Sequence, residues 1–157
     1  MTSPLAKETL RQFRIIVGAA RQHFRTLEER CGIPGAQVWL LAVINEHPGI
    51  TVSHLSESLS IHVSTASNML DKLDKAKLVE RRRGEMDRRV VNLYVTPSGR
   101  AILERAPRPL TGLVPDALNR LSESDLARLH EDLARLIEKM KPVDMSLGNE
   151  PLSTLVR

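Results

Sequence analysis

One stretch, Thr51 to Thr96, constrains the fold of this 157-residue chain more than any other, because the spacing of its apolar residues changes in a fixed order. Helical spacing begins behind Thr51, a good helix-capping residue, and resumes after a short turn to run from Val63 to Lys75. The spacing then changes to two, which predicts an antiparallel hairpin with strands 80–83 and 88–95 around a tip at 84–87. Helix, turn, helix and a two-stranded ribbon together predict a winged helix-turn-helix.

The second helix of this stretch has two faces of opposite chemistry. Its apolar stripe recurs at three-four-three spacing and comprises Val63, Ala66, Leu70 and Leu73. The opposite face carries polar side chains, namely Ser64, Asn68, Asp71, Lys72 and Lys75. Packing on a core by one face while presenting hydrogen-bonding groups on the other is typical of a helix that lies in the DNA major groove.

The ribbon that follows is rich in arginine. Between Glu80 and Arg89 there are five arginines against three acids, so the ribbon is net basic. A basic ribbon beside a two-helix reader indicates a wing that reaches the phosphate backbone or the minor groove. The candidate DNA-binding residues are therefore Ser64, Thr65, Ser67, Asn68, Lys72, Arg81, Arg82, Arg83, Asp87, Arg88 and Arg89.

These residues also have plainer interpretations. Ser64 or Thr65 can cap the helix, and Asp71 and Lys75 lie four residues apart and can form a surface ion pair. A run of arginines can be no more than the solvated face of a strand. The position of this run beside a reader helix favours the DNA-binding interpretation.

The overall composition permits nucleic-acid binding and argues against other classes. The net charge is +4 with a pI near 9.6, and aromatic residues make up only 3% of the chain. Stacking platforms for single-stranded nucleic acid are therefore not expected. The longest apolar run, Val38 to Ile44, is too short to span a bilayer, and charged residues interrupt the N-terminal segment where a signal peptide would lie. We expect a cytoplasmic protein that contacts no membrane.

A long helix is predicted near the N-terminus, from Pro4 to about Arg30, with Ser3 as its cap. Its apolar residues alternate at spacings of three and four and form a heptad seam of Leu10, Phe13, Val17, Ala20, Phe24, Leu27 and Cys31. A helix of this length is roughly 40 Å long, which is more than a small core can cover. The seam therefore predicts a partner chain. The alternative is packing within the chain, because heptads also occur inside bundles.

Three further helices are predicted. The segment 36–46 is apolar nearly all round, contains Trp39, and is expected to be a buried hub. Another helix begins at Thr96 and is expected to break between Ala106 and Asp116, where prolines crowd the chain. The last helix follows Ser122, a residue of a near capping box. It carries a second seam, formed by Leu126, Leu129, Leu133, Leu136 and Met140.

Together these elements predict a mainly α fold with a small β-wing. A winged helix-turn-helix DNA-binding region occupies residues 34–96, and the segments 4–31 and 97–141 form a helical dimerisation region built from both termini. The tail, 142–157, contains prolines and a glycine and is expected to be irregular. Two seamed helices that flank a DNA reader fit a homodimer.

The single cysteine and the histidines indicate few other functions. Cys31 allows no internal disulfide and continues the apolar seam, and Glu28 and Glu29 are expected to raise the pKa of its thiol. A packed structural thiol is the favoured interpretation, with an oxidant sensor as the alternative. The five histidines form no pair with tight metal-ligand spacing, and no nucleophile motif or phosphate loop is present. Neither a cofactor nor enzyme chemistry is expected.

Several short motifs in a fixed order resemble the MarR (multiple-antibiotic-resistance regulator) family of bacterial transcription factors. They are Gly49-Ile50-Thr51, Ser64-Thr65-Ala66-Ser67, Leu78-Val79-Glu80-Arg81, Asp87-Arg88-Arg89 and Val95-Thr96-Pro97-Ser98-Gly99. The resemblance implies a winged helix-turn-helix homodimer, usually a repressor. Such a dimer binds a pseudo-palindromic double-stranded operator and is often released by a small anionic or phenolic ligand or by oxidation. The resemblance also implies that Asp87 positions Arg89 for the minor groove.

The chain departs from the family pattern at three places. Lys77 stands where glycine is frequent, and it costs about 1 kcal/mol relative to glycine if the backbone there is left-handed. Asn68 stands where many members carry arginine, and asparagine favours adenine. The proline-rich break after Arg105 is unusual for the scaffold of the dimer.

Two classes of function follow. The first is a ligand-responsive DNA-binding repressor, with a ligand pocket between the dimer helices and the reader, near a buried Trp39. This pocket rests mainly on the resemblance. The second is a protein-interaction module that uses the winged fold and the long helices without reading DNA. The polar face of the reader and the basic wing favour the first class.

Overall fold

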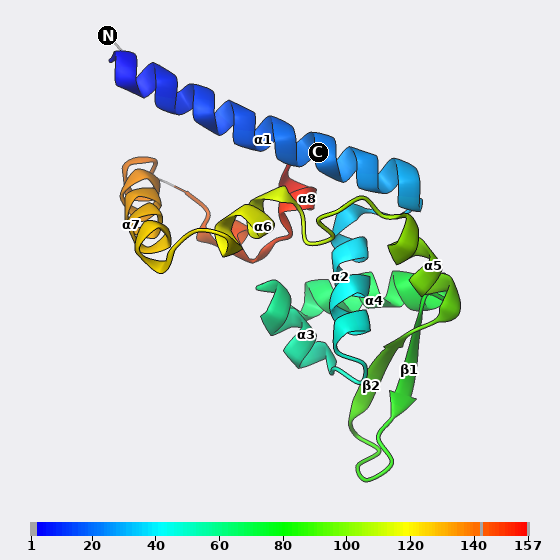
Figure 1. Cartoon of the computed structure of the whole chain (residues 1–157). Helices are drawn as coiled ribbons and strands as arrows, with labels where there is room; N and C mark the ends of the chain where they lie inside the picture. The colour runs from blue at the N-terminus through cyan, green and yellow to red at the C-terminus, as the bar shows by residue number, and fades with distance from the viewer. Residues whose placement is uncertain (1–2, 142, 157) are drawn as a thin grey trace.

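The computed structural model describes residues 3–141 and 143–156. It contains a compact lobe and two projecting arms, which are the N-terminal half of the first helix and the helix at residues 123–139 (Figure 1). The elements in chain order are α1 (Pro4–Cys31), α2 (Gly35–Glu46), α3 (Val52–Leu59), α4 (Val63–Lys75), β1 (Val79–Arg83), β2 (Val91–Val95), α5 (Pro97–Arg105), α6 (Leu113–Asn119), α7 (Glu123–Lys139), η1 (Met145–Asn149) and α8 (Leu152–Leu155). The lobe, α2 to α5 with both strands, lies under the C-terminal half of α1, whereas α6 and α7 lie under its N-terminal half (Figure 1). The predicted fold class is confirmed.

Helix α2 is the centre of the lobe. It is apolar nearly all round, and four of its fully buried side chains are Val38, Leu40, Leu41 and Ile44. Helices α1, α3, α4 and α5 and strand β2 all pack against it. Burial of one such aliphatic side chain contributes about 1.5–3 kcal/mol, so α2 supplies much of the cohesion of the lobe. The predicted hub is confirmed with one correction: Trp39 is half-buried rather than buried, because the lobe leaves one side of α2 partly open.

Helix α1 begins and ends close to the predicted residues. Ser3 Oγ accepts a hydrogen bond from the Ala6 N–H at 3.1 Å, and Gly32 ends the helix in the left-handed region with a φ of 72°. The heptad seam splits in two. Its C-terminal part packs on the lobe, where Leu27 and Cys31 are buried, whereas apolar residues of its N-terminal part are exposed. Packing within the chain, the alternative interpretation of the seam, therefore accounts for only half of the helix.

The wing consists of β1 and β2, paired antiparallel in a two-stranded sheet. The return strand starts at Val91, so the predicted start at Arg88 is wrong. The residues before Val91 belong to the tip, because a hydrogen bond of 3.1 Å from the Val90 N–H to the Asp87 carbonyl closes a turn there. The arginines at the tip are thus held by a turn and not by strand pairing.

The chain between the wing and the last helix is interrupted, as its prolines predict. Thr96 caps α5 through a hydrogen bond from the Gly99 N–H, and this helix ends at Arg105. Helix α6 begins at Leu113, inside the segment predicted to be broken. It can begin there because Pro115 lies in its first turn, where a backbone N–H has no partner within the helix.

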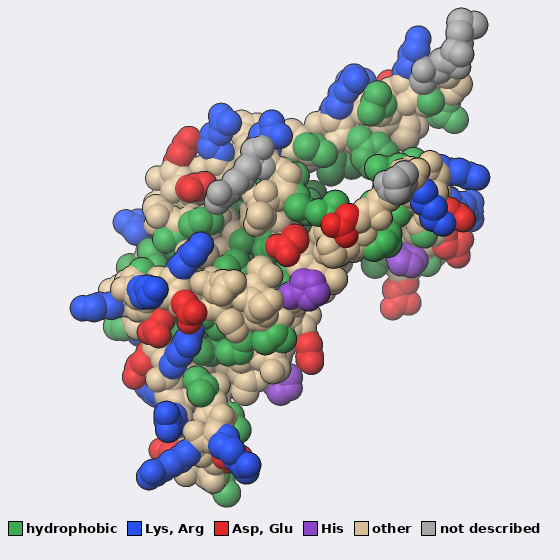
Figure 2. All heavy atoms as spheres, turned by 180° about the vertical axis from the view of Figure 1, so that it is seen from behind, with side chains coloured by type: hydrophobic (Ala, Val, Ile, Leu, Met, Phe, Trp, Pro, Cys, Tyr) green, Lys and Arg blue, Asp and Glu red, His purple; other side chains and the backbone are tan. Residues whose placement is uncertain are grey.

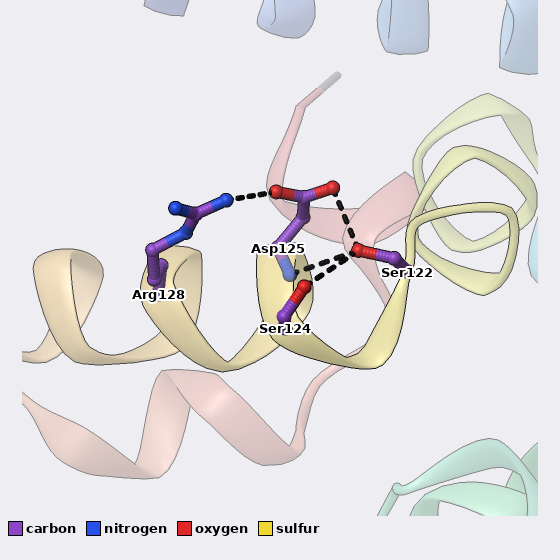
Figure 3. Close-up of polar contacts among 4 residues, drawn as sticks. All are labelled: Ser122, Ser124, Asp125 and Arg128. Carbon is purple, nitrogen blue, oxygen red and sulfur yellow. Dashed lines mark hydrogen bonds and ion pairs between the residues drawn. The ribbon is translucent and has the colours of Figure 1, made fainter.

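Helix α7 has a strong N-terminal cap. Ser122 Oγ accepts a hydrogen bond from the Asp125 N–H at 3.1 Å, and the Asp125 carboxylate accepts bonds from Ser122 Oγ and from Arg128 (Figure 3). These two bonds, the one from Ser122 first, lower the pKa of Asp125. The helix therefore forms where the sequence predicts. Against the rest of the described chain, however, α7 buries none of its residues, so its seam is largely open.

The C-terminal tail corrects one prediction. The segment was expected to be irregular, but it forms the short helices η1 and α8 (Figure 1). Ser153 and Val156 are buried, and Arg21 of α1 donates from Nε to the Val156 carbonyl at 2.8 Å. The described part of the tail therefore returns to α1 and α2 of its own chain. Pro142 and Arg157 lie outside the described residues.

Candidate DNA-binding interface

Helix α4 presents a polar face to solvent, as predicted. Its buried face consists of Ala66, Leu70 and Leu73. Its exposed face carries Ser64, Asn68, Asp71, Lys72 and Lys75, while Thr65 and Ser67 are half-buried beside it. The assignment of Val63 to the apolar stripe is wrong, because this side chain is 50% exposed in a first turn that precedes the packed part of the helix. The polar side of α4 is therefore exposed to solvent along the helix, where it can contact the major groove of duplex DNA.

The N-terminus of α4 is not capped by a side chain of the described chain. His62 occupies the N-cap position, and its side chain makes no capping hydrogen bond. The interpretation of Ser64 or Thr65 as the cap is therefore wrong, since both residues lie inside the first turn. The unsatisfied amides of this 13-residue helix carry a partial positive charge, which suits the oxygen of a phosphate.

The wing tip holds one arginine in a fixed place. Asp87 Oδ1 accepts hydrogen bonds from the Arg89 backbone N–H at 2.9 Å and from Arg89 Nε at 3.3 Å. The Arg89 side chain is nevertheless 92% exposed. The carboxylate therefore orients the guanidinium without burying it, which is the relation expected for Asp87 and Arg89. The two residues lie in the turn that the hydrogen bond from the Val90 N–H to the Asp87 carbonyl closes.

The middle of the wing is braced by a second arginine. The Arg82 guanidinium lies over the ring of Tyr94, 4.5 Å from the centroid, and forms an ion pair of 2.8 Å with Glu80. The hydrogen bond from Arg82 lowers the pKa of the Glu80 carboxyl. Arg83 and Arg88 are exposed nearby. Lys and Arg side chains gather on the projecting wing in Figure 2.

One candidate DNA-binding residue, Arg81, is turned toward the reader helix. Its Nη2 lies 2.5 Å from Asp71 Oδ1, and its Nε lies 3.6 Å from Asp74 Oδ2. Asp71 therefore pairs with the wing, and the proposed surface pair with Lys75 is wrong. Asp74 is not among the residues predicted from the sequence to lie at this interface. Its position three residues after Asp71 was the available signal, since that spacing places both carboxylates on one side of a helix.

The turn from α4 into the wing contains the predicted left-handed residue. Lys77 has a φ of 58°, a conformation in which glycine carries no steric penalty. Its carbonyl accepts a hydrogen bond from Thr96 Oγ1 at 2.8 Å, and the Lys77 N–H donates to the Asp74 carbonyl at 2.9 Å. These bonds hold the turn despite its conformational cost, and so they fix where the wing leaves α4.

A cavity of about 300 Å³ lies away from this interface, between α1, the start of α2 and the tail. It is lined by Arg21, Phe24, Arg25, Glu28, Pro34, Gly35, Ser153 and Val156. Trp39, around which a ligand pocket was predicted, is not part of this lining. The cavity combines two guanidinium groups one helical turn apart with an aromatic side chain.

Cys31 is buried where α1 meets the lobe, with Sγ 4.0 Å from the Ile102 carbonyl. Burial raises the pKa of its thiol, and the nearby charges of Arg105 and Arg30 oppose that rise. The direction of the shift agrees with the prediction, but the predicted cause, Glu28 and Glu29, is wrong. A buried thiol held in its protonated form is a poor nucleophile.

Residues 3–141 and 143–156 contain no group of three or more histidine, cysteine or acidic side chains arranged to hold a metal ion. Over the same residues, no helix has the length and apolar character needed to cross a membrane.

Comparison with known proteins gives the family. The model of the MarR family matches residues 32–90, which span the α1–α2 turn, α2, the reader and the wing through its tip. A solved structure of a mutant MarR from E. coli, complexed with operator DNA, superposes with a TM-score of 0.56 at 27% identity, over 86% of this chain and 99% of that one. The chain is therefore similar to the MarR family, both over the segment that the family model matches and along most of the DNA-bound MarR structure.

Two curated MarR-family relatives are regulators from Bacillus subtilis (strain 168). The HTH-type transcriptional repressor MdtR is 27% identical over 124 residues, which is 77% of this chain and 80% of that protein. The organic hydroperoxide resistance transcriptional regulator is 28% identical over 122 residues, which is 76% of this chain and 80% of that protein. The similarity therefore extends well beyond the reader and includes much of the helical scaffold.

Proposed function

We propose that this MarR-family protein is a sequence-specific double-stranded DNA-binding regulator of transcription, acting as a repressor in the cytoplasm and not as an enzyme. One observation carries the proposal. The exposed polar face of α4 stands beside a wing whose tip arginine, Arg89, is oriented by Asp87 yet is 92% exposed. A reader helix supplies base contacts, and an exposed cation beside it supplies contacts to phosphate or the minor groove. The repressor MdtR and the DNA-bound MarR support the same assignment.

We further propose that the functional unit is a homodimer. The N-terminal half of α1 exposes large apolar residues, namely Leu5, Leu10, Ile15, Ile16 and Val17. The seam of α7 is also open, with Leu126, Leu133, Leu136 and Met140 exposed by 36 to 58%. Figure 2 shows hydrophobic side chains along these two arms. Apolar surface on this scale marks an interaction site, and two heptad seams in one chain suit a second copy of the same chain.

The arms also leave room for this second copy. One apolar cavity of about 670 Å³ lies between the start of α1 and the end of α7, and another of about 350 Å³ lies among α1, α6 and α7. Interlocking arms from a partner would fill both. Light scattering at micromolar concentration should give about twice 17.6 kDa. A persistent monomer would refute the dimer.

The DNA-binding function has a direct test. The protein is titrated against labelled duplexes from the region upstream of its own gene and against a scrambled duplex of equal length. A specific site should bind tighter than the scrambled duplex, and footprinting should reveal an inverted repeat with half-sites roughly 34 Å apart. Equal affinity for all duplexes would refute sequence-specific reading. No binding at all would favour the protein-interaction module.

We also propose that a small organic anion releases the DNA and that it binds in the cavity lined by Arg21 and Arg25. Two guanidiniums suit a carboxylate, and Phe24 suits the apolar body of the ligand. Salicylate and related phenolic anions are added to the DNA complex, with the wild type compared with Arg25→Gln. Arg14→Gln, outside the cavity on the same helix, is the matched control. Release that persists in Arg25→Gln would overturn this site. Release by peroxide that vanishes in Cys31→Ser would establish oxidant sensing instead.

A further inference from the structure

The exposed face of α4 contains two carboxylates that a DNA-reading helix should avoid. Asp71 follows Asn68 by three positions and so lies on the same side of the helix. Asp74 lies three positions further on, and both side chains are about half-exposed, at 54 and 47%. Carboxylates near a phosphate backbone repel it, and this repulsion is strong at low ionic strength. Something in the chain must offset these two charges if α4 enters a groove.

Arg81 is placed to offset them. It lies in β1, the strand of the wing that follows α4 in the chain, and it contacts Asp71 at 2.5 Å and Asp74 at 3.6 Å. Its side chain is 35% exposed, compared with 58% for Arg82 and 92% for Arg89. Arg81 is thus the most enclosed of these three wing arginines, and its guanidinium faces the helix rather than the solvent beyond the wing.

The same contacts tie the wing to the reader. The turn between α4 and β1 contains the left-handed Lys77, and Arg81 adds a link between the two elements four residues later. An arginine can serve two carboxylates because its planar guanidinium presents five donors. Together the guanidinium and the two carboxylates carry a net charge of −1, so this cluster does not attract phosphate.

We propose that Arg81 is a positioning residue, which masks Asp71 and Asp74 from the DNA phosphates and fixes the wing relative to α4, without itself binding DNA. This inference rests on the proposed function. The rival is that Arg81 leaves its acids and joins Arg83 and Arg89 on the backbone of the duplex. The two accounts differ in what happens when the acids are removed together with the arginine.

The experiment is a rescue measured as a salt titration. Arg81→Ala should weaken binding to operator and scrambled duplexes by about tenfold, because two unmasked carboxylates then face the phosphates. Adding Asp71→Asn and Asp74→Asn should restore most of the affinity and return the slope of log K against log salt to the wild-type value. If Arg81 binds phosphate, the triple variant stays weak and its slope stays smaller by about one contact.

Arg83→Ala is the matched control, two residues further along the same strand. No ion pair of Arg83 occurs among the described residues, so its loss should reduce the salt slope by about one, and the two asparagine substitutions should not rescue it. If the wild-type protein binds neither the operator nor the scrambled duplex, the proposed function is refuted. If the wild-type protein binds DNA but the triple variant does not regain its affinity, only the masking role of Arg81 is refuted.

A second variant keeps the inference testable if Arg81→Ala fails to fold. Asp71→Asn with Asp74→Asn, in the presence of Arg81, releases the guanidinium. Masking then predicts tighter binding to scrambled DNA and a slope larger by about one contact, since one cation is freed. An unchanged slope would mean that Arg81 already contacts phosphate in the wild type, and it would overturn the proposal.

Discussion

The lobe and the arms of this protein share the same three-four spacing of apolar residues, but in the lobe these residues are buried within the chain and in the arms they are exposed. In the lobe, the stripe of α4 closes on α2, so that Leu70 and Leu73 are fully buried within one chain. In the arms, the seam of α7 has the same spacing, yet Leu133 is 36% exposed. Spacing therefore specifies an apolar face, but the length and position of the helix decide what covers that face.

Helix α1 contains both cases in one element. Its C-terminal half lies on the lobe, where Leu27 is fully buried, and its N-terminal half runs past the lobe, where Val17 is 42% exposed. The helix has 28 residues, so it is much longer than the lobe beneath it. The N-terminal half of α1 therefore extends beyond the lobe, and the rest of its own chain does not cover its apolar residues. We assign this half to the contact with a partner chain.

The largest expected effect comes from substitutions that disrupt the apolar seam of α7 and leave the residues of the lobe unchanged. Leu129→Glu with Leu133→Glu places two charges in the seam of α7, so the dimer should dissociate to monomers of 17.6 kDa. Operator affinity should fall by roughly 10²–10⁴-fold, because two linked half-site contacts become one. Light scattering and DNA titration measure the two effects.

The control for this variant lies on the other side of the same helix. Glu131→Gln with Glu138→Gln changes two exposed positions outside the seam and should leave both mass and affinity near wild type. A folded dimer with normal affinity in the double leucine variant would mean that α7 plays no part in assembly, and it would contradict the assignment of the arms.

The next effect distinguishes leucines buried in the lobe from leucines in the seam of α7. The loss of stability on substitution should depend on protein concentration only for the seam leucines. Leu70→Ala opens a cavity in the lobe and should lower the free energy of unfolding by about 2–5 kcal/mol at any protein concentration. Leu133→Ala should destabilise mainly through dimerisation, so its Tm should rise toward wild type as concentration increases. Calorimetry over a hundredfold range of concentration distinguishes them. A concentration-independent loss in Leu133→Ala would place that leucine in a core of its own chain.

Features set by neighbouring residues could be predicted from the sequence. The helix caps Ser3, Thr51 and Ser122 act at the expected places, since a cap depends on a side chain and an amide three residues apart. The Asp87–Arg89 contact was likewise within reach, because the two residues are two apart.

Features set by contacts between distant segments could not be predicted. Arg81 meets Asp71 across ten residues, and Arg21 meets Val156 across 135. Both contacts depend on how elements pack, so two predictions made from local spacing are wrong: the pairing of Asp71 with Lys75 and the irregular tail. Val63 was misplaced for a related reason: spacing cannot tell where a helix first reaches the core.

The smallest effect concerns Cys31, which is buried at the lobe end of α1. Its raised pKa means that the folded state favours the neutral thiol. This stabilising contribution is present below the thiol's ordinary pKa and is lost as the pH rises through the raised value. Wild type should therefore lose slightly more stability than Cys31→Ala between neutral and alkaline pH.

Thiol labelling provides an independent check on Cys31. The native protein at neutral pH should react with iodoacetamide much more slowly than the urea-unfolded chain, which is the control. Labelling at equal rates in the two states would contradict the burial of the thiol and would reopen the oxidant-sensor interpretation.

The reader and the wing tip within the lobe give the most direct test of the account, because they are assigned different work on the same DNA. Asn68→Ala and Arg89→Ala are titrated at several salt concentrations against the operator and a scrambled duplex. Arg89→Ala should weaken both duplexes alike and reduce the salt slope by about one. Asn68→Ala should keep the wild-type slope, lose roughly 1–3 kcal/mol on the operator, and leave the scrambled duplex nearly unaffected. Equal weakening of both duplexes by Asn68→Ala would contradict the account, because α4 would then position the protein without reading the sequence.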